Sequence, residues 1–102
     1  MTRQQLSCIH HVGIPVKNIK RVVERYTKRF QCEIVYQDEI WAMIGFENIN
    51  LAIVVQEQHP PHVAFEPENA EEYGPLKDHR DRSRSTYIED SENNTVEIMA
   101  AD

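Results

Sequence analysis

Two imidazoles and one carboxylate are the residues of this sequence best suited to chemistry. His11, His62 and Glu97 lie in three separate segments whose apolar residues alternate as in β-strands. Two histidines and one carboxylate form the facial triad, a ligand set that leaves coordination positions open for substrate or water. These donors suit Fe, Zn, Ni, Mn or Co as the divalent metal ion, and the lack of a nearby thiolate argues against a structural zinc site. The alternative is three unrelated polar residues, with His62 satisfied by a local bond and Glu97 on an exposed strand.

The elements that position these residues follow from the spacing of the apolar side chains. Asn18 offers an N-cap. Apolar residues then recur at helical spacing from Ile19 to Phe30, and they predict an amphipathic helix that ends near Gln31. Alternation predicts strands at 8–16, 33–37, 40–46, 49–55, 62–66, 84–89 and 95–100. The first half of the chain therefore reads as a strand, a helix and three strands.

The second half repeats this order in shorter form. Its first strand, 62–66, is followed by a helical turn at 69–73, which a Gly-Pro pair ends. Residues 67–83 are too few for a full helix and an edge strand together, so one of these two elements must be short or missing. The sequence thus predicts an α+β protein whose second half is truncated.

Each predicted strand has one apolar face and one face of different chemistry, because side chains alternate along a strand. The apolar sets, such as Val12, Ile14 and Val16, must face the helices. The opposite face carries His11, Trp41, Met43, Asn50, Ala52, His62, Tyr87 and Glu97. If the sheet curls so that this face is concave, these side chains converge in a pocket.

Length and composition limit the class of protein. At 102 residues, 40% of them hydrophobic, the chain is expected to form one domain, 1–102. A net charge of −6 argues against nucleic-acid binding, and the basic but acid-interrupted segment 77–84 is interpreted as a solvated loop. No segment has the roughly 20 apolar residues of a membrane helix, and none at the N-terminus has signal-peptide character. We therefore expect a cytoplasmic protein without a membrane partner, with Cys8 and Cys32 reduced and buried.

Four stretches of the sequence resemble proteins of the glyoxalase/bleomycin-resistance/extradiol-dioxygenase (vicinal oxygen chelate) superfamily. His11–Asn18 resembles the first strand and helix entry of these proteins, and Tyr26–Phe30 the end of the helix that follows. His62–Glu66 is similar to the strand that opens their second module, and Tyr87–Met99 to their terminal hairpin. The superfamily includes glyoxalase I, methylmalonyl-CoA epimerase, extradiol dioxygenases and bleomycin-resistance proteins. The resemblance covers nearly the whole chain.

This resemblance implies a fold and a ligand set. The fold would be two βαβββ modules, at about 6–58 and 61–100, that form a curved mixed sheet around a divalent metal ion. By position, His11, His62 and Glu97 match three of the family's ligands. The fourth ligand lies on the strand 49–55, where the family usually carries Glu, Gln or His. Here the matching residue is Asn50 or Ala52, depending on register, and only Asn50 could supply an oxygen.

The function implied is that of a small metal-dependent enzyme, a lyase, isomerase or dioxygenase, acting on a small-molecule substrate chelated through oxygen. Tyr87 is the candidate for proton transfer or orientation, and Trp41 and Met43 for the apolar wall of the pocket. Lys77, Arg80, Arg82 or Arg84 could meet an anionic group of the substrate. The turn before Glu97 also resembles that of extradiol dioxygenases, with His79, Tyr87 and Asp90 at compatible spacing, but Ser91 and Asn93 replace the Pro and Gly of their motif.

A binding protein without catalytic activity is the alternative function. Such a bleomycin-resistance-like protein would hold a flat ligand by stacking on Trp41 and Tyr87 and would need no metal. The missing fourth ligand favours this alternative, whereas the intact set of two histidines and a glutamate opposes it. In either case a truncated second module leaves part of its sheet uncovered, which predicts a homodimer.

Overall fold

The computed structural model describes residues 6–55 and 60–100 of the chain. Its elements, in order, are β1 (Cys8–Val16), α1 (Ile19–Arg29), β2 (Glu33–Gln37), β3 (Trp41–Gly45), β4 (Asn50–Val55), β5 (His62–Glu66), the 3-10 helix η1 (Ala70–Tyr73), β6 (Lys77–Asp78), β7 (Arg84–Glu89) and β8 (Thr95–Met99). Every strand predicted from alternation is present, and the structure adds β6. Residues 56–58, the end of the predicted first module, lie outside the described residues.

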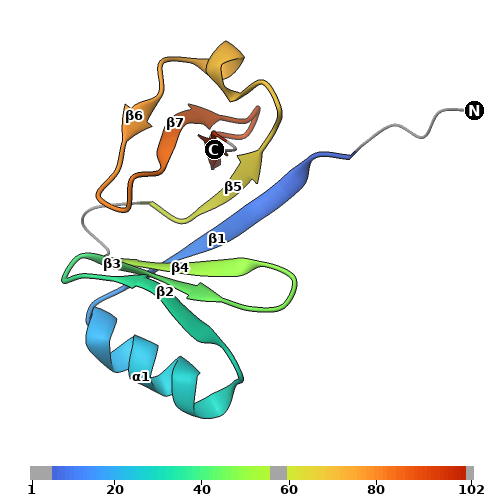
Figure 1. The fold of residues 1–102 in the computed structure, drawn as a ribbon. Coiled ribbons are helices and arrows are strands. Elements are labelled where there is room, and N and C mark those ends of the chain that lie inside the picture. Colours follow the sequence, from blue (N-terminus) through green and yellow to red (C-terminus); the bar gives the residue numbers. More distant parts are fainter. Residues whose placement is uncertain (1–5, 56–59, 101–102) are drawn as a thin grey trace, which may run out of the picture.

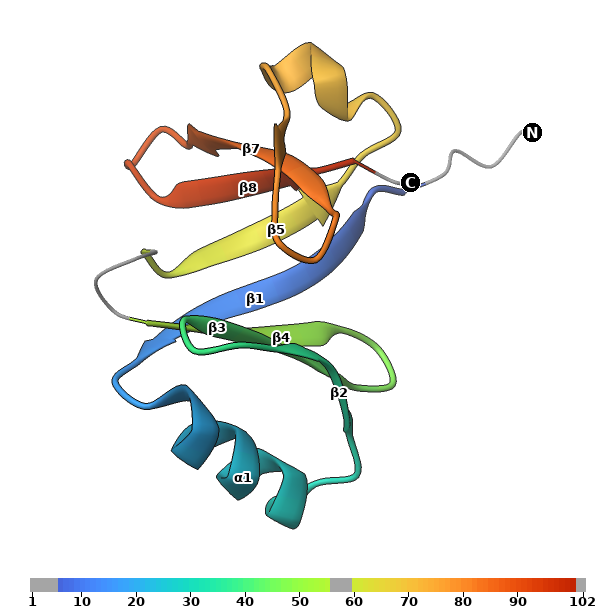
Figure 2. The same ribbon diagram turned by 60° about the vertical axis from the view of Figure 1, so that its left-hand side comes forward.

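The strands form one mixed sheet in the order β2-β3-β4-β1-β5-β8-β7-β6. β1 and β5 pair antiparallel at its centre, while β1 pairs parallel with β4 and β5 parallel with β8. Each half of the chain therefore builds one half of the sheet, with its first strand at the centre. The sheet curls, so that β2–β4 and β7–β8 turn toward one another across β1 and β5 (Figures 1 and 2). The predicted α+β class and curved mixed sheet are confirmed.

α1 covers the outer face of the first half, below β3 and β4 in Figure 2. The Asn18 side chain caps the helix by accepting from the Arg21 amide at 3.0 Å, as the sequence predicts. The helix ends at Arg29, two residues before the predicted end. Its buried face packs on apolar residues from three strands, and this core contains Ile19, Val23, Ala42, Ile44 and Ile53, with Ile14, Val16, Leu51 and Val55 packed against it. The apolar faces assigned from alternation are the ones that meet the helix.

In the second half, η1 and β6 stand where the first half has a full helix and an edge strand. η1 spans four residues and β6 two. The sequence predicted that one of these two elements would be short or missing; the structure has both of them, and each is short. η1 packs against β7 and β8 and buries Ala70.

A β-bulge interrupts the seam between the two halves. Ile9 pairs with Phe65, but the next pair along β1 is His11 with Ala64, so His10 is the extra residue. Beyond the bulge, Gly13 pairs with His62. The bulge therefore sets which residues of β1 face the concave side of the sheet.

The predicted burial of the cysteines is wrong for Cys8, which is exposed at the start of β1, and Cys32 is only partly buried. Both thiols are free, as expected. Cys8 lies at the outer end of the central strand, where no described element covers its side chain.

Among the described residues, no helix has both the length and the apolar character needed to cross a membrane.

Candidate metal centre

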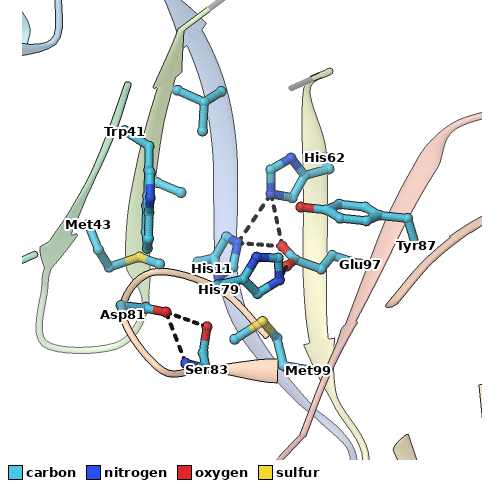
Figure 3. A pocket seen from close by; sticks show the side chains of 12 residues that line it. His11, Trp41, Met43, His62, His79, Asp81, Ser83, Tyr87, Glu97 and Met99 are labelled. Atoms are coloured by element: carbon cyan, nitrogen blue, oxygen red, sulfur yellow. Dashed lines mark hydrogen bonds and ion pairs between the residues drawn. The ribbon is translucent and has the colours of Figure 1, made fainter. Parts of the chain in front are cut away.

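His11, His62 and Glu97 converge on the concave side of the sheet, one from each of β1, β5 and β8 (Figure 3). All three side chains are buried, with residue exposures of 3%, 6% and 4%. The donor atoms lie close to one another: His11 Nε2 is 3.0 Å and His62 Nε2 is 3.1 Å from Glu97 Oε1, and the two nitrogens are 3.2 Å apart. The structure therefore brings together the three residues that the sequence selects as metal ligands.

These distances fit a single divalent ion. Ligand atoms at about 2.1 Å from a metal and about 90° apart around it are separated by roughly 3.0 Å from each other. The three observed separations are all near this value. Three donors arranged as one face of an octahedron leave the opposite face open. The donor set and its geometry thus fit the divalent ion that the sequence predicts, without selecting one element.

The hydrogen bonds behind the histidines prepare them for this role. His62 Nδ1 lies 2.9 Å from the Pro60 carbonyl oxygen, which can only accept, so Nδ1 holds a proton. When His62 is neutral, its Nε2 is therefore unprotonated and available to bind a metal. His11 Nδ1 lies 2.7 Å from His10 Nδ1, which can accept in the same way. A partner on the outer nitrogen is the usual arrangement for a metal-binding histidine.

Glu97 is held by a third group, the Ser85 hydroxyl. Ser85 Oγ donates to Glu97 Oε2 at 2.7 Å, and Ser85 is 1% exposed. Burial alone would raise the pKa of Glu97, but hydrogen bonds from His11, His62 and Ser85 outweigh it and hold the pKa well below its usual range. Burial likewise tends to lower the pKa of His62, yet the bonds to Glu97 and Pro60 and the charge of Glu97 raise it. Without a metal, the cluster therefore favours a protonated His62 beside an ionised Glu97.

These two shifts predict how stability depends on pH. The lowered Glu97 pKa stabilises the metal-free protein above the unfolded value of 4.5, and this contribution is lost as pH falls through the folded value. The raised His62 pKa stabilises it below 6.5, and this contribution is lost as pH rises through the folded value. A metal must displace the His62 proton, so the gain in Tm on adding metal should grow from about pH 5 to about pH 8. Thermal denaturation with and without the ion measures this gain, and a gain independent of pH would contradict the expectation.

A pocket opens directly beside the cluster. Its cavity volume is about 50 Å³, and it is lined by His11, Trp41, Met43, Ala52, Val54, His62, His79, Asp81, Ser83, Tyr87, Glu97 and Met99. Trp41 and Met43 form the wall on the β3 side, where the sequence analysis places them (Figure 3). Trp41 also stacks on Tyr36, with ring centroids 4.5 Å apart, which fixes its indole.

Tyr87 extends from β7 on the other side, with its hydroxyl directed toward His62 and Glu97 (Figure 3). Its ring stands edge-on to His62, with centroids 5.9 Å apart. Burial of the hydroxyl, the charge of Glu97 and a hydrogen bond to this carboxylate all raise the pKa of Tyr87. At neutral pH the phenol therefore keeps its proton and can donate it to a bound oxygen atom.

The segment 77–84 is not the solvated loop that its charges suggest. β6 and β7 form a hairpin, and the loop at its tip places His79, Asp81 and Ser83 along the pocket. His79 Nε2 lies 2.5 Å from Ser85 Oγ and 3.7 Å from Glu97 Oε2. The charges of neighbouring residues along the chain do not reveal that this loop lies against the pocket once the sheet curls.

Arg80, on the same loop, is not among the residues that line the pocket. Its guanidinium pairs with Asp38 at 3.1 Å, between β2 and β3. Asp38 also accepts from the Tyr36 hydroxyl and from the amides of Ile40 and Trp41. Although burial opposes the shift, these bonds and the one from Arg80 lower the pKa of Asp38 to about 2. The loop is thus tied to the opposite half of the sheet by a contact that the sequence analysis did not find.

The position of a fourth ligand belongs to Ala52 and not to Asn50. On β8, Glu97 lies two residues beyond Thr95, the partner of His62. On β4, Ala52 lies two residues beyond Asn50, the partner of His11, so Ala52 is the counterpart of Glu97 in the first half. Ala52 lines the pocket, whereas Asn50 Nδ2 donates to the His10 carbonyl at 3.2 Å. The structure therefore does not bring Asn50 together with the other three predicted ligands.

Comparison with known proteins places the fold but not the reaction. No protein-family model and no curated protein matches the sequence significantly. Solved structures do match. Methylmalonyl-CoA epimerase from Mycobacterium tuberculosis is 15% identical, with 98% of this chain and 92% of that chain covered and a TM-score of 0.73. A hypothetical protein from Bacillus halodurans C-125 is 11% identical, with 96% of each chain covered and a TM-score of 0.74.

A third similar structure is named NAD-dependent benzaldehyde dehydrogenase, from Legionella pneumophila. It is 15% identical, with 88% of this chain and 96% of that chain covered and a TM-score of 0.63. The names of these proteins differ in chemistry, so the shared architecture does not select a reaction. The chain shares the fold of these solved structures, methylmalonyl-CoA epimerase among them, and this agrees with the fold that the sequence resemblance implies.

Proposed function

We propose that the protein is a metal-dependent enzyme that acts on a small molecule bound to the metal through oxygen atoms. The observation that carries this proposal is the buried cluster of His11, His62 and Glu97, whose donor atoms are spaced as the ligands of one ion. A buried carboxylate between two imidazoles serves no packing purpose, since apolar residues of similar size would fill the space at lower cost. The cluster also borders the pocket and is not enclosed in the core.

The residues of the chain divide the work of such a reaction. His11, His62 and Glu97 would hold the ion, which when bound acts as a Lewis acid on a substrate oxygen. Tyr87, protonated at neutral pH, donates a hydrogen bond to an oxygen that gains negative charge. Ser85 holds Glu97 in place through its second oxygen. Trp41 and Met43 exclude water on the β3 side and orient the apolar part of the substrate.

Binding without catalysis is the second candidate function, and one observation favours it. Ala52 occupies the position opposite Glu97, so the first half of the sheet contributes only His11 to the cluster. An isomerase or lyase that needs a base on that side would lack it. A protein that sequesters a flat ligand would need only the stacked Tyr36–Trp41 wall and Tyr87.

Metal loading followed by a chelation assay tests the proposal. Untagged protein is loaded with Fe(II), Mn(II), Co(II), Ni(II) or Zn(II), and bound metal is counted after desalting. We expect one ion per chain, and we expect 4-methylcatechol to change the absorption spectrum of the Co(II) form, because open positions remain for two oxygens. Failure of every ion to bind would refute the enzyme proposal. If Co(II) binds but its absorption spectrum does not change when the catechol is added, the open coordination positions are not available to a substrate.

We also propose that the protein is a cytoplasmic homodimer. Among the described residues, η1 is the element that packs on the outer side of β7 and β8; it spans four residues, and Ile88 is 37% exposed. A second copy of the chain would bury this apolar surface. We expect light scattering at tens of micromolar to give the mass of a dimer, and Ile88→Glu to give that of a monomer. A monomeric mass for the unchanged protein would contradict the proposal.

A further inference from the structure

The pocket beside the cluster has an unusual distribution of charge. Among its lining residues, all within the described part of the chain, there is no lysine or arginine. Two carboxylates line it instead, Glu97 in the cluster and Asp81 on the loop between β6 and β7. The other walls are mainly apolar or aromatic, from Trp41, Met43 and Met99.

The basic residues near the pocket do not reach it. Arg80 pairs with Asp38 in the turn between β2 and β3, and 62% of its side chain is exposed. Lys77 and Arg82 are exposed, and neither lines the pocket, nor does Arg84. The sequence-based idea that these cations meet an anionic substrate group is therefore not supported. A phosphate or carboxylate on the substrate would face Asp81 with no lysine or arginine on these walls to compensate it.

Asp81 is held in a defined position on the pocket wall. Its Oδ1 accepts from the Ser83 amide at 3.0 Å and from the Ser83 hydroxyl at 2.6 Å. The residue is only partly exposed, and it lies on the Met43 side of the pocket, away from Tyr87 (Figure 3). A substrate chelated at the cluster would extend past Trp41 toward this carboxylate.

We infer that Asp81 selects substrates that carry an amine or another hydrogen-bond donor at the end remote from the metal, and that it disfavours anionic ones. The inference that the substrate carries vicinal oxygens rests on the proposed function. Selection by Asp81 between cationic and anionic substrates does not require a metal. The substrate class is thus a small, largely apolar molecule with vicinal oxygens at one end and an amino or donor group at the other. A carboxylate paired with an ammonium in a partly buried pocket gives a charge-assisted hydrogen bond, stronger than a neutral one.

Three catechols that differ in one group test this inference: dopamine, 4-methylcatechol and 3,4-dihydroxyphenylacetate. Their dissociation constants are measured by calorimetry without oxygen, on the Zn(II)-loaded and the metal-free protein. We expect dopamine to bind about tenfold more tightly than 3,4-dihydroxyphenylacetate, with 4-methylcatechol between them. Quenching of Trp41, the single tryptophan of the chain, gives an independent report from inside the pocket.

Asp81→Asn is the decisive variant, because asparagine keeps the oxygen that accepts from Ser83 but removes the charge. It should reduce the preference for dopamine to about twofold or less, and Asp81→Lys should reverse it. Glu24→Gln, the loss of one negative charge on the exposed side of α1, is the matched control and should keep the preference. The same preference in Asp81→Asn as in the unchanged protein would overturn the inference, as would binding of none of the three catechols.

The two proposals can fail separately. If no ion binds but the metal-free protein still prefers dopamine in an Asp81-dependent way, the proposed enzyme function fails and the role of Asp81 stands. If zinc increases the affinity for all three catechols equally in Asp81→Asn and in the unchanged protein, the metal site stands and the role of Asp81 is refuted.

Discussion

His62→Ala should weaken the binding of divalent metal by more than about a hundredfold, the largest effect expected of any single substitution in this protein. His62 supplies one of the three donor atoms of the cluster, and the ring is pre-aligned by its bond to the Pro60 carbonyl. Its pairing partners on the two neighbouring strands, Gly13 and Thr95, carry neither an imidazole nor a carboxylate. Calorimetric titration with Zn(II) or Co(II) measures the loss.

His10→Gln is the matched control for this variant. His10 is adjacent to the cluster, and its side chain contacts the outer nitrogen of His11, at 2.7 Å. Loss of such an outer partner typically costs about 10- to 100-fold in metal affinity, less than the loss of a ligand. Equal effects of His10→Gln and His62→Ala, or no effect of His62→Ala, would show that the triad is not the metal site.

Gly13→Ala should displace the His62 ring and lower metal affinity by about tenfold or more, although the added group is only a methyl. A Cβ at position 13 would lie 2.3 Å from His62 Cε1 and 2.7 Å from Nε2, too close for any real contact. The ring must therefore move away from β1, and with it one donor atom of the cluster. Metal affinity and the catechol-induced spectrum of the Co(II) form measure the displacement.

Gly45→Ala is the corresponding control on β3. There the nearest atom to an added Cβ is Val35 Cγ2 at 3.1 Å, and no residue of the cluster is close. We expect this variant to change folding stability slightly and metal affinity not at all. If both glycine variants lose metal to the same extent, the loss reflects general damage to the sheet and not the position of His62.

The strand pattern predicted much of the fold and the cluster because alternation depends only on neighbouring residues. Side chains of residues i and i+2 lie on the same face of a strand. Once β1, β5 and β8 were identified, this rule assigned His11, His62 and Glu97 to the face opposite the apolar core. The same rule separated the core under α1 from the pocket wall of Trp41 and Met43. These parts of the site needed no knowledge of which strands pair.

Features that depend on the pairing of strands distant in the sequence could not be predicted from the alternation of residues. The choice between Asn50 and Ala52 required the register of β1 against β4, and the bulge at His10 required that of β1 against β5. The bulge leaves no local signal, because a pair of histidines fits an ordinary strand equally well. The loop that carries Asp81 was missed because its charges suggested solvent. The Asp-x-Ser spacing at residues 81–83 is a turn signal that could have indicated a defined loop.

An anomalous-scattering map of crystals grown with Co(II) or Zn(II) tests the central claim most directly. We expect one strong peak within bonding distance, about 2.0–2.2 Å, of His11 Nε2, His62 Nε2 and Glu97 Oε1, with its remaining positions open toward Trp41 and Tyr87. A peak held by other residues, or no peak at this cluster in protein that binds metal in solution, would contradict it.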